Sequence, residues 1–133
     1  MIYLLDTCTL SDYLKGESNT IKRFHQTTPY DICVSSITVF EIEYGLLPKP
    51  SLIKKINPQL QAIYKKVKTI NFSPIEAKAA ANIRKNLKQA GTPIGYYELL
   101  IAATAQVNNL IIVTSNTKEF SRVENLRLEN WRL

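Results

Sequence analysis

The sequence predicts an α/β domain built on one mostly parallel sheet with helices on both faces. Short apolar runs at residues 2–5, 31–36 and 110–115 have the composition of buried strands, and helical patterns separate them. Two weaker runs, at residues 68–72 and 126–133, each indicate a further strand. Strands that alternate with helices pair in parallel through right-handed crossovers, so the helices must cover both faces of the sheet.

The helices of the N-terminal half are predicted from the residues at their ends. Gly16 can end the helix after the first strand, because glycine readily adopts the left-handed conformation of a helix C-terminus. Ser36 is expected to cap the next apolar helix, which Gly45 closes. Residues 51–67 are also helical, but Pro58 should break or kink this helix because proline has no backbone N–H.

The clearest helix signal lies in the C-terminal half. Ser73 is a good N-cap, Pro74 suits the first helical position and Glu76 completes a capping box. Gly91 ends this helix. The helix predicted over residues 96–109 is apolar nearly all round, which is typical of a helix buried between other elements.

Length and composition predict one globular domain over residues 1–133. Hydrophobic residues make up 45% of the chain and charged residues 21%, so disorder is not expected. No apolar stretch approaches the ~20 residues that cross a bilayer, and no secretory signal is visible at the N-terminus. We therefore expect a cytoplasmic protein without a membrane partner.

The chain is basic, which bears on its partners. It has 17 lysine and arginine residues against 11 acidic ones, and a formal net charge of +6. This charge favours an anionic partner, and nucleic acid first, because nucleic acids are the commonest large polyanions. A solvated basic surface without a dedicated partner is the alternative.

Acidic residues nevertheless follow the strands. Asp6 comes directly after the first strand, and Glu119 lies shortly after the strand at residues 110–115. The carboxyl ends of parallel strands meet at one edge of a sheet, where α/β folds form their sites, so both acids are expected there. Each also has a structural explanation, Asp6 as a helix cap and Glu119 as a surface charge on a turn.

Two further glutamates are candidates for the same site. Glu41 shares a helix face with Ile37, which is an unusual place for a solvated charge. Periodicity alone does not decide between Glu41 and Glu43 of the same helix, although a solvent-facing position is preferred for Glu43. Glu98 enters the buried helix three residues after Gly95, and if Gly95 is the N-cap, the Glu98 carboxylate could simply bond back to the backbone.

Taken together, these acids indicate a metal site. Carboxylates that crowd together repel one another unless a cation neutralises them. Oxygen ligands alone suit Mg²⁺ or Mn²⁺ rather than zinc, and the two cysteines, Cys8 and Cys33, lack the spacing of a zinc site. Such acids within a basic protein are what phosphodiester hydrolysis needs, since basic residues hold the strand and the metals activate water and stabilise the leaving oxygen.

At these acids the sequence resembles the PIN-domain nucleases, and in particular the VapC-type toxins of bacterial toxin–antitoxin modules. Four segments carry the resemblance, in the family's order: YLLDTCTL, VSSITVFEIEYG, GTPIGYYELLIAATA, and IVTSNTKEF with LENW. The resemblance places the family's metal-binding acids on Asp6, Glu41 and Glu98. It therefore implies Glu41 rather than Glu43.

The resemblance implies a PIN-like three-layer α/β/α sandwich and a Mg²⁺- or Mn²⁺-dependent endoribonuclease, which a cognate antitoxin holds inactive. It also implies a homodimer. Two positions depart from the family's pattern: its third acid is usually aspartate and is here Glu98, and many members have a fourth acid where this chain has Asn116. We expect Glu119 to supply the remaining charge and Asn116 to contribute to the same site.

Two other functions are compatible with these residues. An aspartate after the first strand, followed by threonine, also suggests a phosphatase with an aspartyl nucleophile. Such enzymes usually carry a second aspartate two residues later, where this chain has Cys8. The other alternative is a catalytically weakened PIN-like module, in which Glu98 and Asn116 reduce metal binding, and which binds RNA or a protein partner without cutting.

Overall fold

One five-stranded parallel sheet forms the centre of the protein. The computed structural model describes residues 1–133, and its strands pair in the order β3–β2–β1–β4–β5. Every pairing is parallel. The strands are β1 (Tyr3–Leu5), β2 (Ile32–Ser35), β3 (Lys68–Ile70), β4 (Ile111–Val113) and β5 (Leu128–Glu129). All five predicted strands are therefore present, and each is shorter than the run that predicted it.

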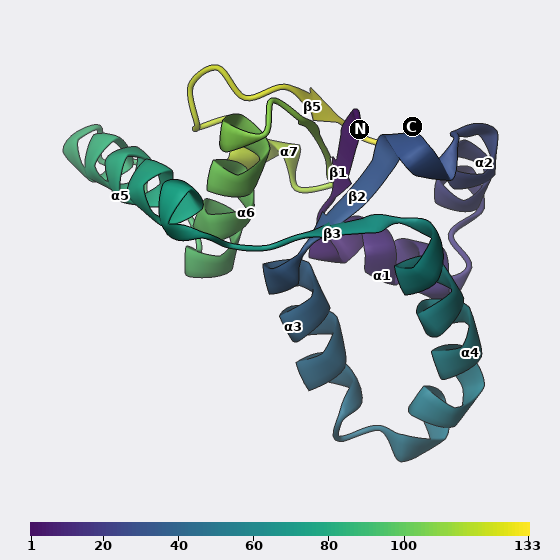
Figure 1. Cartoon of the computed structure of the whole chain (residues 1–133). Helices are drawn as coiled ribbons and strands as arrows, with labels where there is room; N and C mark the ends of the chain where they lie inside the picture. The colour runs from purple at the N-terminus through teal and green to yellow at the C-terminus, as the bar shows by residue number, and fades with distance from the viewer.

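Seven α-helices surround this sheet. Helices α3 and α4 extend downward from the sheet in Figure 1, whereas α5 lies far to the left and packs against α6. None of the helices combines the length and the apolar surface that a membrane span requires. The helices are α1 (Thr7–Lys15), α2 (Ser18–Gln26), α3 (Ser36–Leu46), α4 (Pro50–Lys66), α5 (Pro74–Gln89), α6 (Tyr96–Val107) and α7 (Thr117–Phe120).

Two apolar cores lie on opposite faces of the sheet. Successive residues of a strand point to opposite faces, so Leu4 packs in the core that contains α5 and α6, and Leu5 packs in the core that contains α1, α2 and α4. Ile112 and Val113 of β4 divide in the same way. All four side chains are fully buried. The predicted three-layer α/β/α sandwich is therefore confirmed.

The strand order reverses between β1 and β4, and this position defines an edge where a site can form. β2 and β3 lie on one side of β1, whereas β4 and β5 lie on the other. Leu5 pairs with both Val34 and Val113, so β1 and β4 end at the same level and β2 extends one residue further, to Ser35. The backbone N–H of Asp6 extends the pairing by donating to the Val113 carbonyl at 3.0 Å.

Several helix ends form as the sequence predicts. Gly16 has a φ of 90° at the end of α1, a conformation that glycine adopts without steric cost. Ser73 and Glu76 form the capping box at the start of α5, and Gly91 follows the end of that helix with a φ of 72°. Gly95 is the N-cap of α6.

Both predicted ends of α3 are wrong. Ser35 rather than Ser36 caps this helix, since the Ser35 hydroxyl accepts a backbone N–H from its first turn at 3.0 Å. Gly45 does not close the helix, which continues to Leu46. Leu46 is buried one turn after Ile42, so the extra residue extends the apolar face that packs in the core.

Of the break or kink expected at Pro58, the break is absent. α4 continues without interruption from Pro50 to Lys66. Both Pro58 and Lys54 are exposed, so water can hydrate the Lys54 carbonyl, which has no N–H partner at Pro58. The helix therefore tolerates proline on its outer face.

Candidate active site

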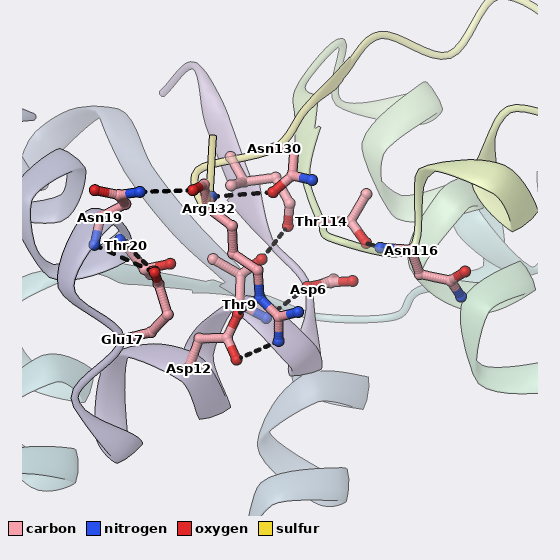
Figure 2. A network of polar contacts seen from close by, with 11 residues as sticks. Asp6, Thr9, Asp12, Glu17, Asn19, Thr20, Thr114, Asn116, Asn130 and Arg132 are labelled. Carbon is pink, nitrogen blue, oxygen red and sulfur yellow. Dashed lines mark hydrogen bonds and ion pairs between the residues drawn. The ribbon is translucent and has the colours of Figure 1, made fainter.

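Asp6 is the most enclosed of the candidate acids, with 3% of its surface exposed. It is the N-cap of α1, and its carboxylate accepts the backbone N–H of Thr9 at 2.8 Å. The Thr114 side chain, directly after β4, lies close enough to this carboxylate to lower its pKa, and Figure 2 shows both residues at the same edge of the sheet. Burial raises the pKa of Asp6 despite these contacts, and the nearby charge of Asp12 adds to the rise.

Asp12 differs from Asp6 in having a basic partner. Arg132 donates two hydrogen bonds to its carboxylate, from Nε at 2.6 Å and from Nη2 at 2.8 Å (Figure 2). The neighbouring Trp131 is buried in the core that contains α1, which fixes the arginine's position. Asp12 is therefore a structural residue, whereas Asp6 forms no ion pair.

Glu41 approaches the same edge of the sheet from α3. Its Oε1 accepts the hydroxyl of Thr7, the first residue of α1, at 2.6 Å. Burial raises the pKa of Glu41, the Thr7 hydrogen bond opposes this rise, and repulsion from Glu98 adds to it. Glu43 is exposed and accepts only a long hydrogen bond from the Tyr64 hydroxyl, at 3.4 Å. Glu41 thus faces the other acids, and Glu43 faces solvent.

Glu98 lies in the first turn of α6, which Gly95 caps. The backbone N–H of Gly95 donates to Oε1 of Glu119 at 2.5 Å and not to Glu98. Glu119, and not Glu98, therefore accepts the N–H of the residue that caps α6. Oε2 of Glu98 lies so close to Gly95 that a Cβ atom at this position would overlap with it. Only glycine leaves the Glu98 carboxylate where it is.

Asn116 and Glu119 form the far side of the group. Nδ2 of Asn116 donates to Oε2 of Glu119 at 2.7 Å. Hydrogen bonds from the Gly95 N–H and from this amide lower the pKa of Glu119. The backbone N–H of Asn116 donates to the Thr114 hydroxyl at 2.9 Å, so a single threonine connects this side of the group to Asp6.

The acids from distant parts of the chain share one region around the start of α1. The pKa of the Cys8 thiol is raised to about 11, mainly by burial and then by the negative charges of four nearby acids. These acids are Asp6, Asp12, Glu98 and Glu41. No three acidic, histidine or cysteine side chains already form a metal site. The donor set still fits Mg²⁺ or Mn²⁺, because it consists of carboxylate oxygens. Two of these acids, Asp6 and Glu41, have raised pKa values.

The sequence prediction of the site misses three residues: Thr7, Thr114 and Gly95. Thr7 and Thr114 have a positional signal, since each lies within two residues of the carboxyl end of a neighbouring strand, β1 or β4. Their role depends on contacts with Glu41 and Asp6 across the sheet edge. Nothing in the local sequence marks Gly95 as more than a cap.

A groove with a volume of about 430 Å³ opens beside Glu41 and Thr7. Its apolar residues come from α1, α3 and α4: Leu14, Ile42, Leu46, Leu52 and Ile56. Three exposed lysines border it: Lys15, Lys49 and Lys55. Such a groove fits an amphipathic peptide that carries acidic residues.

The raised pKa of Asp6 predicts how stability depends on pH in the absence of divalent ions. The native state holds the Asp6 proton to a higher pH than the unfolded state, so its stabilising contribution is complete below the ordinary aspartate pKa. That contribution is lost as pH rises through the raised pKa. Asp6→Asn should therefore unfold at a temperature several degrees higher than the wild type at neutral pH. The two proteins should differ much less in acid.

Thermal unfolding in EDTA across this pH range, followed by circular dichroism, measures the difference. Glu43→Gln is the matched control, since Glu43 is exposed and its replacement should leave the pH profile unchanged. Parallel pH profiles for the wild type and Asp6→Asn would contradict the prediction.

The comparisons with known proteins agree with this architecture. The sequence matches the family model of the PIN domain over residues 3–126. Among curated relatives, Ribonuclease VapC2 of Haemophilus influenzae is 34% identical over 130 residues, which cover 97% of each chain. The tRNA(fMet)-specific endonuclease VapC of Shigella flexneri is 29% identical over 129 residues, again 97% of each chain.

Solved structures of VapBC complexes contain the same fold. DNA-bound VapBC from Salmonella typhimurium matches with a TM-score of 0.89 and 30% identity, covering 98% of both chains. VapBC2 from Rickettsia felis, bound to a DNA fragment from its promoter, matches with a TM-score of 0.88 and 31% identity over 98% of this chain and 99% of that one. With the sheet and the acids described above, these matches identify the family: the chain belongs to the PIN-domain proteins and, among them, to the VapC ribonucleases.

Proposed function

We propose that this protein is an endoribonuclease that depends on Mg²⁺ or Mn²⁺ and acts as the toxin of a toxin–antitoxin pair. The observation that carries the proposal is the group of acids at the carboxyl edge of the sheet, where Asp6 is buried without a basic partner. Curated relatives that are named ribonucleases and solved relatives that are VapBC complexes support it.

Asp6, Glu41 and Glu98 are the residues that we assign to the metal. Their oxygen atoms are the kind of ligand that Mg²⁺ and Mn²⁺ prefer. The raised pKa values of Asp6 and Glu41 belong to carboxylates whose charge the protein does not balance by itself. A divalent cation bound by these acids would supply positive charge to the phosphate and lower the pKa of a water molecule.

The neighbouring residues hold these acids in position. Thr7 fixes one oxygen of Glu41. Asn116 orients Glu119, which in turn bonds the N–H of Gly95 at the start of the helix that carries Glu98. We therefore assign Asn116 and Glu119 to the outer part of the site. An asparagine at 116 lacks a negative charge but donates the hydrogen bond that positions Glu119, which an ionised aspartate could not do.

Structured RNA is the substrate class that we propose. The net charge of +6 favours binding to a phosphate backbone, and lysine and arginine side chains would position it beside the acids. Because one relative is named a tRNA(fMet)-specific endonuclease, tRNA is the first candidate within this class.

We assign the antitoxin to the groove between α1, α3 and α4. The groove reaches Glu41, so a peptide seated in it would also block the acids. Its apolar residues and its three bordering lysines call for a segment with apolar side chains on one face and acidic residues beside them.

A second copy of the chain is the partner that we propose for an exposed aromatic patch. Phe40 and Tyr44 of α3 stack with ring centroids 6.1 Å apart, and Tyr97 of α6 lies 5.7 Å from Phe40. All three side chains are exposed. Contiguous exposed aromatic residues on two helices mark an interaction surface, which supports a homodimer.

Metal-dependent cleavage is the direct test of the proposed activity. The purified protein should cut tRNA in Mg²⁺ or Mn²⁺ and stop when EDTA is added. Asp6→Asn should slow cleavage on the order of 10²- to 10³-fold, because it removes a negatively charged ligand of the proposed metal and keeps a residue that can cap α1. Glu43→Gln, which changes an exposed acid of α3, should cleave like the wild type.

Cleavage that continues in EDTA would contradict the metal proposal. A protein that binds RNA but cuts in neither metal would instead favour the weakened binding module. Calorimetric titration with Mn²⁺ separates these cases, since a module without a site should show no stoichiometric binding.

Gly95→Ala should slow cleavage without unfolding the protein. The new Cβ would displace Oε2 of Glu98, and a displacement of about 1 Å can cost on the order of 10²-fold in rate. In a Glu98→Asp background the same change should cost much less, because the shorter carboxylate does not reach over residue 95. Equal costs in both backgrounds, measured in single turnovers, would disprove this explanation. Gly45→Ala is the control, since a Cβ there meets nothing within 4 Å.

Leu52→Asp should weaken antitoxin binding at least about 10-fold, since it places a charge among the apolar residues of the groove. RNA cleavage should be retained. The measurement is co-expression with the small reading frame beside its gene, followed by growth and affinity assays. Ile75→Asp, an exposed apolar residue on α5, is the matched control and should leave neutralisation intact. Full neutralisation of Leu52→Asp would place the antitoxin elsewhere.

A further inference from the structure

A second hollow lies between α5 and the start of α6, outside the group of acids. It has a volume of about 200 Å³, and Leu87 and Leu99 are its buried apolar residues. Arg84 and Lys88 of α5 and Tyr96 of α6 also line it. Pockets for whole small molecules usually measure about 300–1,000 Å³, so this one has room for a planar ring and little more.

Tyr96 and Arg84 give this hollow the chemistry of a base-stacking site. The Tyr96 side chain is 67% exposed, and its large ring contributes little to the core. The Arg84 guanidinium carbon lies 5.0 Å from the ring centroid, and its Nη2 is 3.5 Å from the Tyr96 hydroxyl. The exposed ring and the guanidinium over it form a planar stack that a second planar group can extend.

The positive charges of this hollow are not neutralised within the protein. Neither Arg84 nor Lys88 forms an ion pair with a carboxylate. Both are exposed, and they stand on one helix about one turn apart. An aromatic ring beside unpaired cations is the combination that single-stranded nucleic acids use, with a base on the ring and phosphates at the cations.

The hollow is fixed relative to the acids. Tyr96 and Glu98 belong to the same first turn of α6. The loop that precedes this helix is held at two points: Arg122 Nη1 donates to the Pro93 carbonyl at 2.8 Å, and Gly95 N–H donates to Glu119. A group bound on Tyr96 is therefore held by the same backbone that carries Glu98.

We propose that this hollow is a subsite for an unpaired base of the RNA substrate, which stacks on Tyr96 while Arg84 and Lys88 contact the adjoining phosphates. The inference rests on the proposed nuclease function and adds a positioning residue to it. A stacked base next to the acids would hold the strand in place during cleavage. Because every base has an aromatic face, stacking positions the strand with little preference for sequence.

The test measures binding of a fluorescent single-stranded RNA to the Asp6→Asn protein in EDTA, where cleavage is not expected. Adding Tyr96→Ala should weaken this binding about 5- to 150-fold, the range expected for loss of one stacked base. Tyr96→Phe should stay within about twofold of the parent, because it keeps the ring. Tyr30→Ala is the matched control, since Tyr30 is an exposed tyrosine beside Lys66 and Lys68, away from this hollow.

In the active protein, Tyr96→Ala should raise KM for RNA by a similar factor, with kcat changed less. Unchanged affinity in Tyr96→Ala, or an equal loss in Tyr96→Phe, would overturn the subsite. A change from dimer to monomer by analytical ultracentrifugation would show that this face contacts a second copy, which also overturns it. If the parent neither binds nor cuts RNA, the nuclease proposal fails instead, and the subsite fails with it.

Discussion

The buried carboxylate of Asp6 is the constraint on which the site depends. It sits where the two central strands end, held by the Thr9 N–H and by Thr114, and it has no basic partner. Burying such a charge costs stability beyond what a helix cap requires, which supports the proposed role of Asp6 in metal binding. The other acids are then arranged around a group that the fold already holds rigidly.

Much of the fold follows from local signals, because those signals act within a few residues. The capping box of Ser73 and Glu76 and the left-handed Gly16 depend only on their own helix ends. The prediction fails where tertiary packing decides. Leu46 extends α3 past Gly45 to cover a core. At Pro58 solvent decides instead, since water can hydrate the carbonyl that has no N–H partner and the helix continues.

The site is predictable to a lesser degree. The strand-edge rule brings Asp6 and Glu119 to one edge from sequence alone, and the structure places both there. Periodicity cannot orient Glu41 against Glu43, since the choice depends on Thr7, which belongs to another helix. Gly95 shows the limit most clearly: its importance comes from the Glu98 carboxylate above it, which only a three-dimensional structure reveals.

The order of the strands also has a consequence for synthesis on the ribosome. β1 lies at the centre of the sheet, but its partner β4 is made almost last, together with Thr114, Asn116 and Glu119. A growing chain therefore exposes Asp6 and Glu41 for most of its synthesis without the residues that complete the site. Unfinished polypeptides of this protein should be harmless to the cell. An antitoxin therefore has nearly the whole time that the ribosome takes to synthesise each copy before it must bind that copy.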